Sequence, residues 1–155
     1  MKLDVELVPK TSWGANLRRL LKPKDWDFIR KRQYKLANGV CEICGGRGKN
    51  QGRNHDLECH EQWHYDDETY IQTLIGVIAL CPFCHEVLHF GLTELRGRGP
   101  QALQHLIKVN EYNSLTEALV LIKVAQEKWV ERSTHLWEVD VSWLENNNIF
   151  LKKKA

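Results

Sequence analysis

The chain of 155 residues has no apolar run long enough to cross a bilayer, no internal repeat and no low-complexity linker. Its longest apolar stretches, LIGVIAL at 74–80 and ALVLI at 118–122, are far shorter than the roughly 20 residues that a membrane helix needs. The start, MKLDVELVPK, is charged where a secretory signal has its apolar segment. We therefore expect a single domain over 1–155 in the cytoplasm, with no membrane-bound part and with reduced cysteines.

The net charge of +2 conceals an uneven distribution of charge along the chain. Residues 1–40 hold ten Lys or Arg against four Asp or Glu, whereas residues 41–95 hold three against nine. A basic segment beside an acidic centre suits a nucleic acid held next to a cation site, because phosphates attract cations and metals attract anions. Solvated helix faces explain the same charges equally well.

Local patterns in residues 1–91 predict three strands and two helices. The alternation of apolar and charged residues at 3–8 predicts a short strand, and residues 23–36 predict a helix with a proline in its first turn. Residues 56–63 and 74–80 predict two strands. The segment CPFCHEVLHFG at 81–91 then predicts one short helix that its glycine closes.

The last third of the chain reads as helical. A helix is predicted from about Pro100, and Ser114 with Glu117 forms a capping box ahead of a second one. The segment 141–148 predicts a final short helix. Strands followed by helices predict an α+β fold, in which these helices pack on the cysteine-containing core.

Five cysteines form two equal C-x-x-C pairs and one leftover. In a reducing compartment, two such pairs match a tetrahedral, closed zinc site better than they match disulfides. The zinc ligands would be Cys41, Cys44, Cys81 and Cys84, with free buried cysteines or a redox pair as the alternatives. The leftover Cys59 is expected to face the core from its strand, because nothing near it in sequence would activate a thiol.

Three histidines suggest a second metal site. His85 directly follows the second cysteine pair and His89 lies four residues later, so both project from one face of the predicted helix. Such a pair also occurs by chance on helix surfaces. His60 lies in the first predicted strand, and a hairpin folded over the helix would bring it to the pair, giving three ligands with an open position.

The segments CEIC, LECHE and LIGVIALCPFCHEVLH, in this order, resemble the HNH (ββα-metal, His-Me finger) endonuclease family across residues 41–91. The resemblance implies a zinc-braced ββα-metal core over 41–91. The charge and local patterns outside it predict a basic arm and helix over 1–40 and a helical extension over 92–155. The resemblance implies a structural Zn²⁺ on the four cysteines. It also implies a second divalent cation, Mg²⁺, Mn²⁺, Zn²⁺ or Ni²⁺, on His60, His85 and His89.

Two positions depart from the pattern of that family. The general base, a histidine directly after the first ligand, is Glu61 here, and the asparagine that orients the base is Gly76. A glutamate has an ordinary pKa of about 4.3, which makes it a weak base near neutral pH unless burial raises the pKa. Glu58 is a second carboxylate able to support a ligand or act as base, and His64 is another candidate base, although its position favours exposure.

Two functions remain open on the sequence. The first is a metal-dependent endonuclease that hydrolyses phosphodiester bonds, in which Glu61 activates water. Phosphate contacts would come from Arg18, Arg19, Arg30, Lys31 and Arg32. The second is a catalytically impaired zinc module of the same origin that binds nucleic acid or a partner protein. The retained histidines favour the nuclease, since a four-cysteine zinc alone would serve a scaffold. The expected partner is a nucleic acid, DNA in the first instance, while RNA and the oligomeric state stay open.

Overall fold

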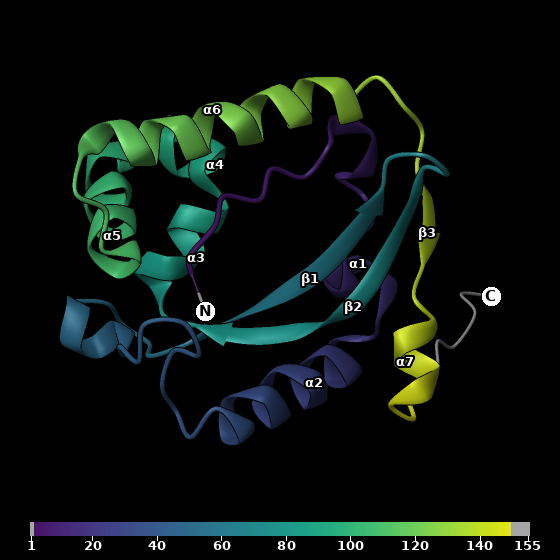
Figure 1. Ribbon diagram of the computed structural model, residues 1–155. Helices are drawn as coiled ribbons and strands as arrows, with labels where there is room; N and C mark the ends of the chain where they lie inside the picture. The colour runs from purple at the N-terminus through teal and green to yellow at the C-terminus, as the bar shows by residue number, and fades with distance from the viewer. Residues whose placement is uncertain (1, 150–155) are drawn as a thin grey trace.

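The computed structural model describes residues 2–149 and contains a three-stranded sheet with helices packed on both of its faces (Figure 1). Strands β1 (Glu58–Asp66) and β2 (Ile71–Leu80) form an antiparallel hairpin, and β3 (Glu138–Asp140) adds to β2 in parallel. The strand order is β1-β2-β3, so β1 lies at an edge of the sheet. The expected α+β class is confirmed. Residues 150–155 of the expected helical extension lie outside the described residues.

Helices make up most of the remaining ordered elements. The α-helices are α1 (Leu17–Leu20), α2 (Pro23–Leu36), α3 (Pro82–Leu88), α4 (Phe90–Leu95), α5 (Gly99–Asn110), α6 (Leu115–Arg132) and α7 (Ser142–Asn146). Two short 3-10 helices are η1 (Lys10–Ser12) and η2 (Gly48–Gln51). Within the described residues, none of these helices has the length and apolar character to cross a membrane.

Several predicted elements agree closely with the structure. The helix predicted over 23–36 is α2, which begins at a proline whose missing N–H costs nothing in the first turn. The helix predicted near Pro100 is α5, and α6 begins after Ser114 as the capping box predicted. Neither hydrogen bond of that box forms, because the Ser114 side chain makes no cap bond and the carboxylate of Glu117 instead accepts from the N–H of Asn113, one residue before the cap, at 2.8 Å.

The strand predicted over 3–8 was wrong. Its side chains alternate between buried and exposed, as in a strand, but its backbone runs beside α3, where the N–H of Glu6 donates to Leu88 O at 3.0 Å. An alternation of apolar and charged residues indicates that one side of an extended segment is buried. A strand also requires a neighbouring strand for its hydrogen bonds. The sequence reading also missed β3, whose three residues are too few to show a pattern.

The single helix predicted over 81–91 is two helices. The helix α3 ends at Leu88, His89 has a non-helical ψ of 42°, and α4 continues to Leu95. Gly91 therefore lies inside α4, and the predicted stop at Gly91 was wrong. A glycine within a helix costs only about 1 kcal/mol relative to alanine, which packing can offset.

Two hydrophobic cores lie on the two faces of the sheet. The first contains Ala79 and Leu80 of β2 with Val87 of α3 and Leu106 of α5, all fully buried. The second packs α1, α2 and α7 against the opposite face around Leu74. Because α3 follows β2 directly and packs in the first core, it is held beneath the hairpin, where residues of β1 and α3 can meet.

Candidate metal centres

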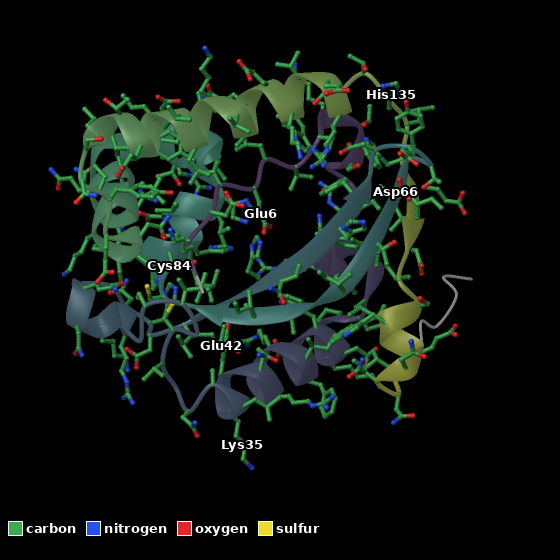
Figure 2. The ribbon with its side chains drawn as sticks, viewed as in Figure 1. Glu6, Lys35, Glu42, Asp66, Cys84 and His135 are labelled. Carbon is green, nitrogen blue, oxygen red and sulfur yellow. The ribbon has the colours of Figure 1, made fainter. Side chains whose placement is uncertain are left out.

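The four-cysteine cluster, Cys41, Cys44, Cys81 and Cys84, joins the turn before the hairpin to the start of α3. Its four sulfur atoms all lie within 4.8 Å of one another, and the Sγ atoms of Cys44 and Cys81 are 3.6 Å apart. Figure 2 shows the yellow sulfur atoms gathered beside the label of Cys84. Four sulfurs bound to zinc at about 2.3 Å stand roughly 3.8 Å apart. The arrangement therefore fits a tetrahedral zinc ion.

Backbone N–H groups point at the sulfur atoms of this cluster. The N–H of Cys44 lies 3.5 Å from the Sγ of Cys41, and the N–H of Cys84 lies 3.5 Å from the Sγ of Cys81. The second pair shows why a helix follows at once, since Cys81 is the N-cap residue of α3 and its sulfur accepts the bond. Such donors stabilise negatively charged thiolates, the form that binds metal.

Contacts among the four thiols shift their pKa values in opposite directions. The hydrogen bond from Cys44 lowers the pKa of Cys41 to about 6, and hydrogen bonds from Cys41 and Cys44 lower that of Cys81. Contacts with Cys41, Cys44 and Cys81 raise the pKa of Cys84. Four thiolates this close repel one another, so they can all ionise only around a cation.

A histidine from the helical extension supports the four-cysteine cluster. The Nε2 atom of His105, in α5, lies 3.2 Å from the Sγ atom of Cys84. An imidazole N–H directed at a thiolate partly neutralises its charge and ties α5 to the site. The sequence contained no signal for this contact, because His105 lies 21 residues from Cys84 in a segment that reads as an ordinary helix.

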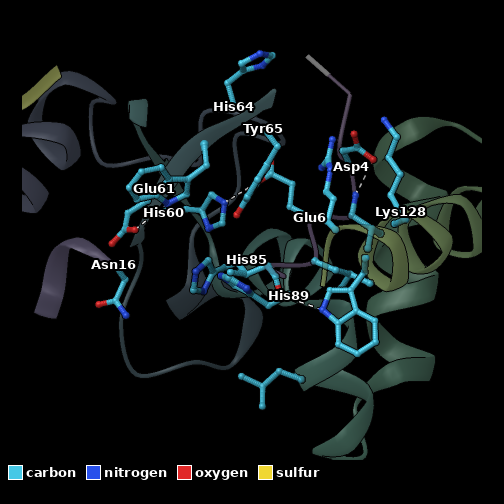
Figure 3. Close-up of a pocket in the computed structure, with 18 of the residues that line it drawn as sticks. Asp4, Glu6, Asn16, His60, Glu61, His64, Tyr65, His85, His89 and Lys128 are labelled. Carbon is cyan, nitrogen blue, oxygen red and sulfur yellow. Dashed lines mark hydrogen bonds and ion pairs between the residues drawn. The ribbon is translucent and has the colours of Figure 1, made fainter. Parts of the chain in front are cut away.

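The three-histidine cluster, His60, His85 and His89, forms where β1 crosses α3. The ring centroids of His60 lie 5.4 Å from His85 and 5.0 Å from His89, and the last two are 4.7 Å apart. One ring nitrogen from each histidine lies within 4.8 Å of the others, so the three can hold a metal ion. Figure 3 shows the three imidazoles together on one wall of a pocket.

Carboxylates contact two of these three imidazoles. Oε2 of Glu58 lies 2.5 Å from Nδ1 of His85, and Oε2 of Glu6 lies 3.0 Å from Nε2 of His60. Glu58 also bonds Nε2 of His55 through its other oxygen at 2.8 Å. Burial would raise the pKa of Glu58, but His85 and then His55 outweigh burial and lower the pKa to about 2.

The pKa of His89 is lowered strongly by its surroundings. Burial lowers its pKa to about 3, and the neighbouring His85 and His60 add to the shift. A neutral imidazole keeps the lone pair that a metal ion requires. The surroundings of His89 therefore favour the protonation state that binds metal.

Two adjoining hollows flank the three-histidine cluster. The first, of about 1030 Å³, lies between β1, α6 and the N-terminal residues 4–8, and all three histidines line it. The second, of about 940 Å³, lies beside α2 and the turn before β1, and His85 lines it as well. The three-histidine cluster consequently opens onto the first hollow, and its His85 also faces the second.

The basic residues predicted to contact phosphate divide into two groups. Arg18 lines both hollows, and Arg30 lines the second, where it forms an ion pair with Asp27 at 2.7 Å. The others lie outside the linings of the two hollows, namely Arg19, Lys31 and Arg32. The structure also places Arg47 in the second hollow and Lys128 in the first, from segments outside the basic stretch 1–40.

Glu61 lines the first hollow but is held by two donors. Its Oε1 accepts from the N–H of Leu17 at 2.8 Å, at the start of α1, and its Oε2 accepts from the indole N–H of Trp63 at 3.0 Å. Burial raises the pKa of Glu61, against the effect of these two hydrogen bonds. The shift has the direction that a base near neutral pH requires.

Cys59, two residues before Glu61 on β1, faces a hydrophobic core, as the sequence predicted. Cys59 and Trp63 pack against the second core, and burial raises the pKa of Cys59 to about 12, so this thiol stays protonated. His64 is exposed and lines the first hollow. The structure therefore leaves His64 accessible as a second candidate base.

Comparison with known proteins gives no match to a family model, to a curated protein or to a solved structure. The resemblance to HNH endonucleases therefore rests on the cysteine and histidine motifs of residues 41–91 alone.

Proposed function

We propose that this chain is a metal-dependent endonuclease of the HNH, or ββα-metal, type that hydrolyses phosphodiester bonds of nucleic acid. The observation that carries the proposal is the meeting of His60 from a hairpin strand with His85 and His89 from the next helix, on the wall of a hollow of about 1030 Å³. A divalent cation bound by these histidines would stabilise the charge that develops on a phosphate under attack. The four-cysteine cluster would hold a structural Zn²⁺ that braces the same helix.

The proposal assigns separate tasks to the residues around the three-histidine cluster. Arg18 lies where the two hollows meet and would contact phosphates of a bound strand, with Lys128 on the opposite wall. Glu61, next to His60, would accept a proton from the attacking water. Its two hydrogen bonds hold the carboxylate in place and leave lone pairs on both oxygens for that proton.

A catalytically impaired zinc module that binds nucleic acid or a partner protein is the second candidate. The observation that favours it is the engagement of both Glu61 oxygens, by the start of α1 and by Trp63, which is what an anchor for α1 requires. Gly76, where the related nucleases carry an asparagine, supports the same alternative.

Plasmid nicking with Mg²⁺, Mn²⁺, Zn²⁺ or Ni²⁺ added one at a time tests the proposal. We expect nicking with at least one cation and its loss in His89→Ala. The matched control is His135→Ala, which removes an imidazole that stacks on Tyr70 away from the cluster. Nicking by His89→Ala at the wild-type rate would refute the proposal, because the activity would then not depend on the three-histidine cluster.

The role of Glu61 decides between the two candidates. Glu61→Gln removes the proton acceptor at nearly constant shape, so we expect turnover to fall roughly 10²-fold or more while nucleic acid stays bound. Glu68→Gln, at an exposed position in the hairpin turn, is the control. If the wild-type chain never cleaves and Glu61→His does, the natural protein is a binding module on a nuclease frame.

A further inference from the structure

The N-terminal segment, residues 2–9, is fixed in place along the three-histidine cluster. Leu3 exchanges two hydrogen bonds of 2.7 Å with the buried side chain of Asn110, at the end of α5. Glu6 donates its N–H to the carbonyl of Leu88, the last residue of α3. The segment passes between α6 and the hairpin in Figure 1, and its position is therefore set by the two helices that it contacts.

Side chains of this segment alternate between the core and the first hollow. Leu3 and Val5 are buried in the first core, whereas Asp4 and Glu6 are exposed and line the hollow. The Glu6 carboxylate, 45% exposed, reaches the nearly buried ring of His60, with 3.0 Å between Oε2 and Nε2. An acid from outside residues 41–91 thus contacts a histidine of the cluster.

We propose that Glu6 is a positioning residue for the metal ion of the three-histidine cluster. Its carboxylate accepts a hydrogen bond from Nε2–H of His60, which leaves the lone pair on Nδ1 for the ion. A neutral imidazole has one donor and one acceptor nitrogen, so a carboxylate that takes the donor selects the tautomer and the orientation of the ring. This inference rests on metal binding by the proposed nuclease and is independent of cleavage.

Glu58 makes an equivalent contact with His85, but at Nδ1, whereas Glu6 contacts His60 at Nε2. Glu58 bonds Nδ1 of His85 at 2.5 Å, which leaves Nε2 of that ring for the ion. Two of the three imidazoles are therefore each oriented by a carboxylate, one from the hairpin and one from the N-terminal segment. The N-terminal segment becomes a structural part of the metal site through this one side chain.

The geometry separates a positioning role from direct coordination. Among the described residues, the group of donor atoms that lie within 4.8 Å of one another contains His60, His85 and His89, and Glu6 lies outside it. The donor atom of a fourth ligand would have to lie within 4.8 Å of the donor nitrogens of all three histidines. Glu6 instead contacts the cluster through His60 alone.

Titration of the zinc-loaded protein with Co²⁺, followed by visible absorption, tests the role of Glu6. We expect Glu6→Ala to weaken Co²⁺ binding at the three-histidine cluster by about 10- to 100-fold, the usual effect of removing a carboxylate behind a metal-bound histidine. Glu6→Gln should weaken it less, because its carbonyl oxygen still accepts from His60. Asp4→Ala removes the same charge from the same segment and should leave the Kd unchanged.

Glu6→Ala would weaken Co²⁺ binding whether Glu6 positions His60 or binds the ion itself. The shape of the Co²⁺ spectrum separates these two roles. At saturation, Glu6→Ala should show the wild-type spectrum, because the ligands are the same. A changed spectrum would make Glu6 a ligand and overturn the proposal, as would a Kd equal to that of Asp4→Ala. Tighter binding by Glu6→Ala would also overturn it, since the carboxylate would then compete with the ion for His60.

Imidazole ¹⁵N spectra of the Zn²⁺-loaded protein test the tautomer directly. We expect a protonated Nε2 and a coordinated Nδ1 on His60, and the reverse assignment would overturn the proposal. Wild-type protein that binds one metal per chain in total would overturn it too. Neither measurement involves nicking, so failure of the nuclease and failure of the Glu6 role remain distinguishable.

Discussion

The four-cysteine and three-histidine clusters share one helix and one pair of adjacent residues, yet their surroundings differ. Cys84 has no exposed surface, whereas His85, the next residue, faces two hollows. Successive residues of an α-helix point about 100° apart, so α3 directs the sulfur of Cys84 to the interior and the imidazole of His85 to the hollows. The comparison shows how a short helix can serve a closed structural site and an open site at once.

The largest effect is expected from the loss of one ligand of the four-cysteine cluster. Cys84→Ser should release zinc and unfold the hairpin and α3, because the binding free energy of a structural zinc is also folding free energy. Its apparent value in small zinc domains is about 10–16 kcal/mol. His85→Ala should keep the fold and one zinc per chain. Elemental analysis with far-ultraviolet circular dichroism measures both. Equal unfolding of the two variants would show that His85 is a structural ligand.

A chelator should distinguish the two clusters in the unaltered protein. The three-histidine cluster lines an accessible hollow, so EDTA should remove its metal quickly without loss of folded structure. Zinc in the four-cysteine cluster should be retained until the protein is denatured, because three of its four ligands are buried. Metal content per chain after gel filtration gives the result. Simultaneous loss of both metals would remove the distinction between closed and open sites.

The smallest effect is expected from the loss of one phosphate contact near the three-histidine cluster. Arg18→Ala should weaken nucleic-acid binding and reduce its salt dependence, because each lost phosphate contact reduces counterion release. Lys31→Ala removes an equal charge from the same basic segment but outside both hollows, and it should have a smaller effect. Fluorescence anisotropy at several salt concentrations measures both variants. Equal effects of the two substitutions would mean that the overall charge, and not a position in the hollows, sets the affinity for nucleic acid.

Local patterns predicted the elements that hold the clusters. The helix over 23–36 was predicted to the residue. The first hairpin strand was predicted to begin two residues early and to end three residues early, and the second was predicted to begin three residues late. The three-histidine cluster was predicted because two of its members share a helix and the third lies in the strand that the hairpin folds over it. Such patterns succeed because they depend on contacts within one turn or one hairpin.

The sequence by itself determined the ligand types, the equal spacing of the two cysteine pairs and the α+β class. Only the tertiary structure placed Glu6 against His60, 54 residues away, and His105 against Cys84, 21 residues away. It also decided that both oxygens of Glu61 bond to Leu17 and Trp63. Contacts between distant segments depend on how whole helices and strands pack against one another, and local spacing contains no record of that packing.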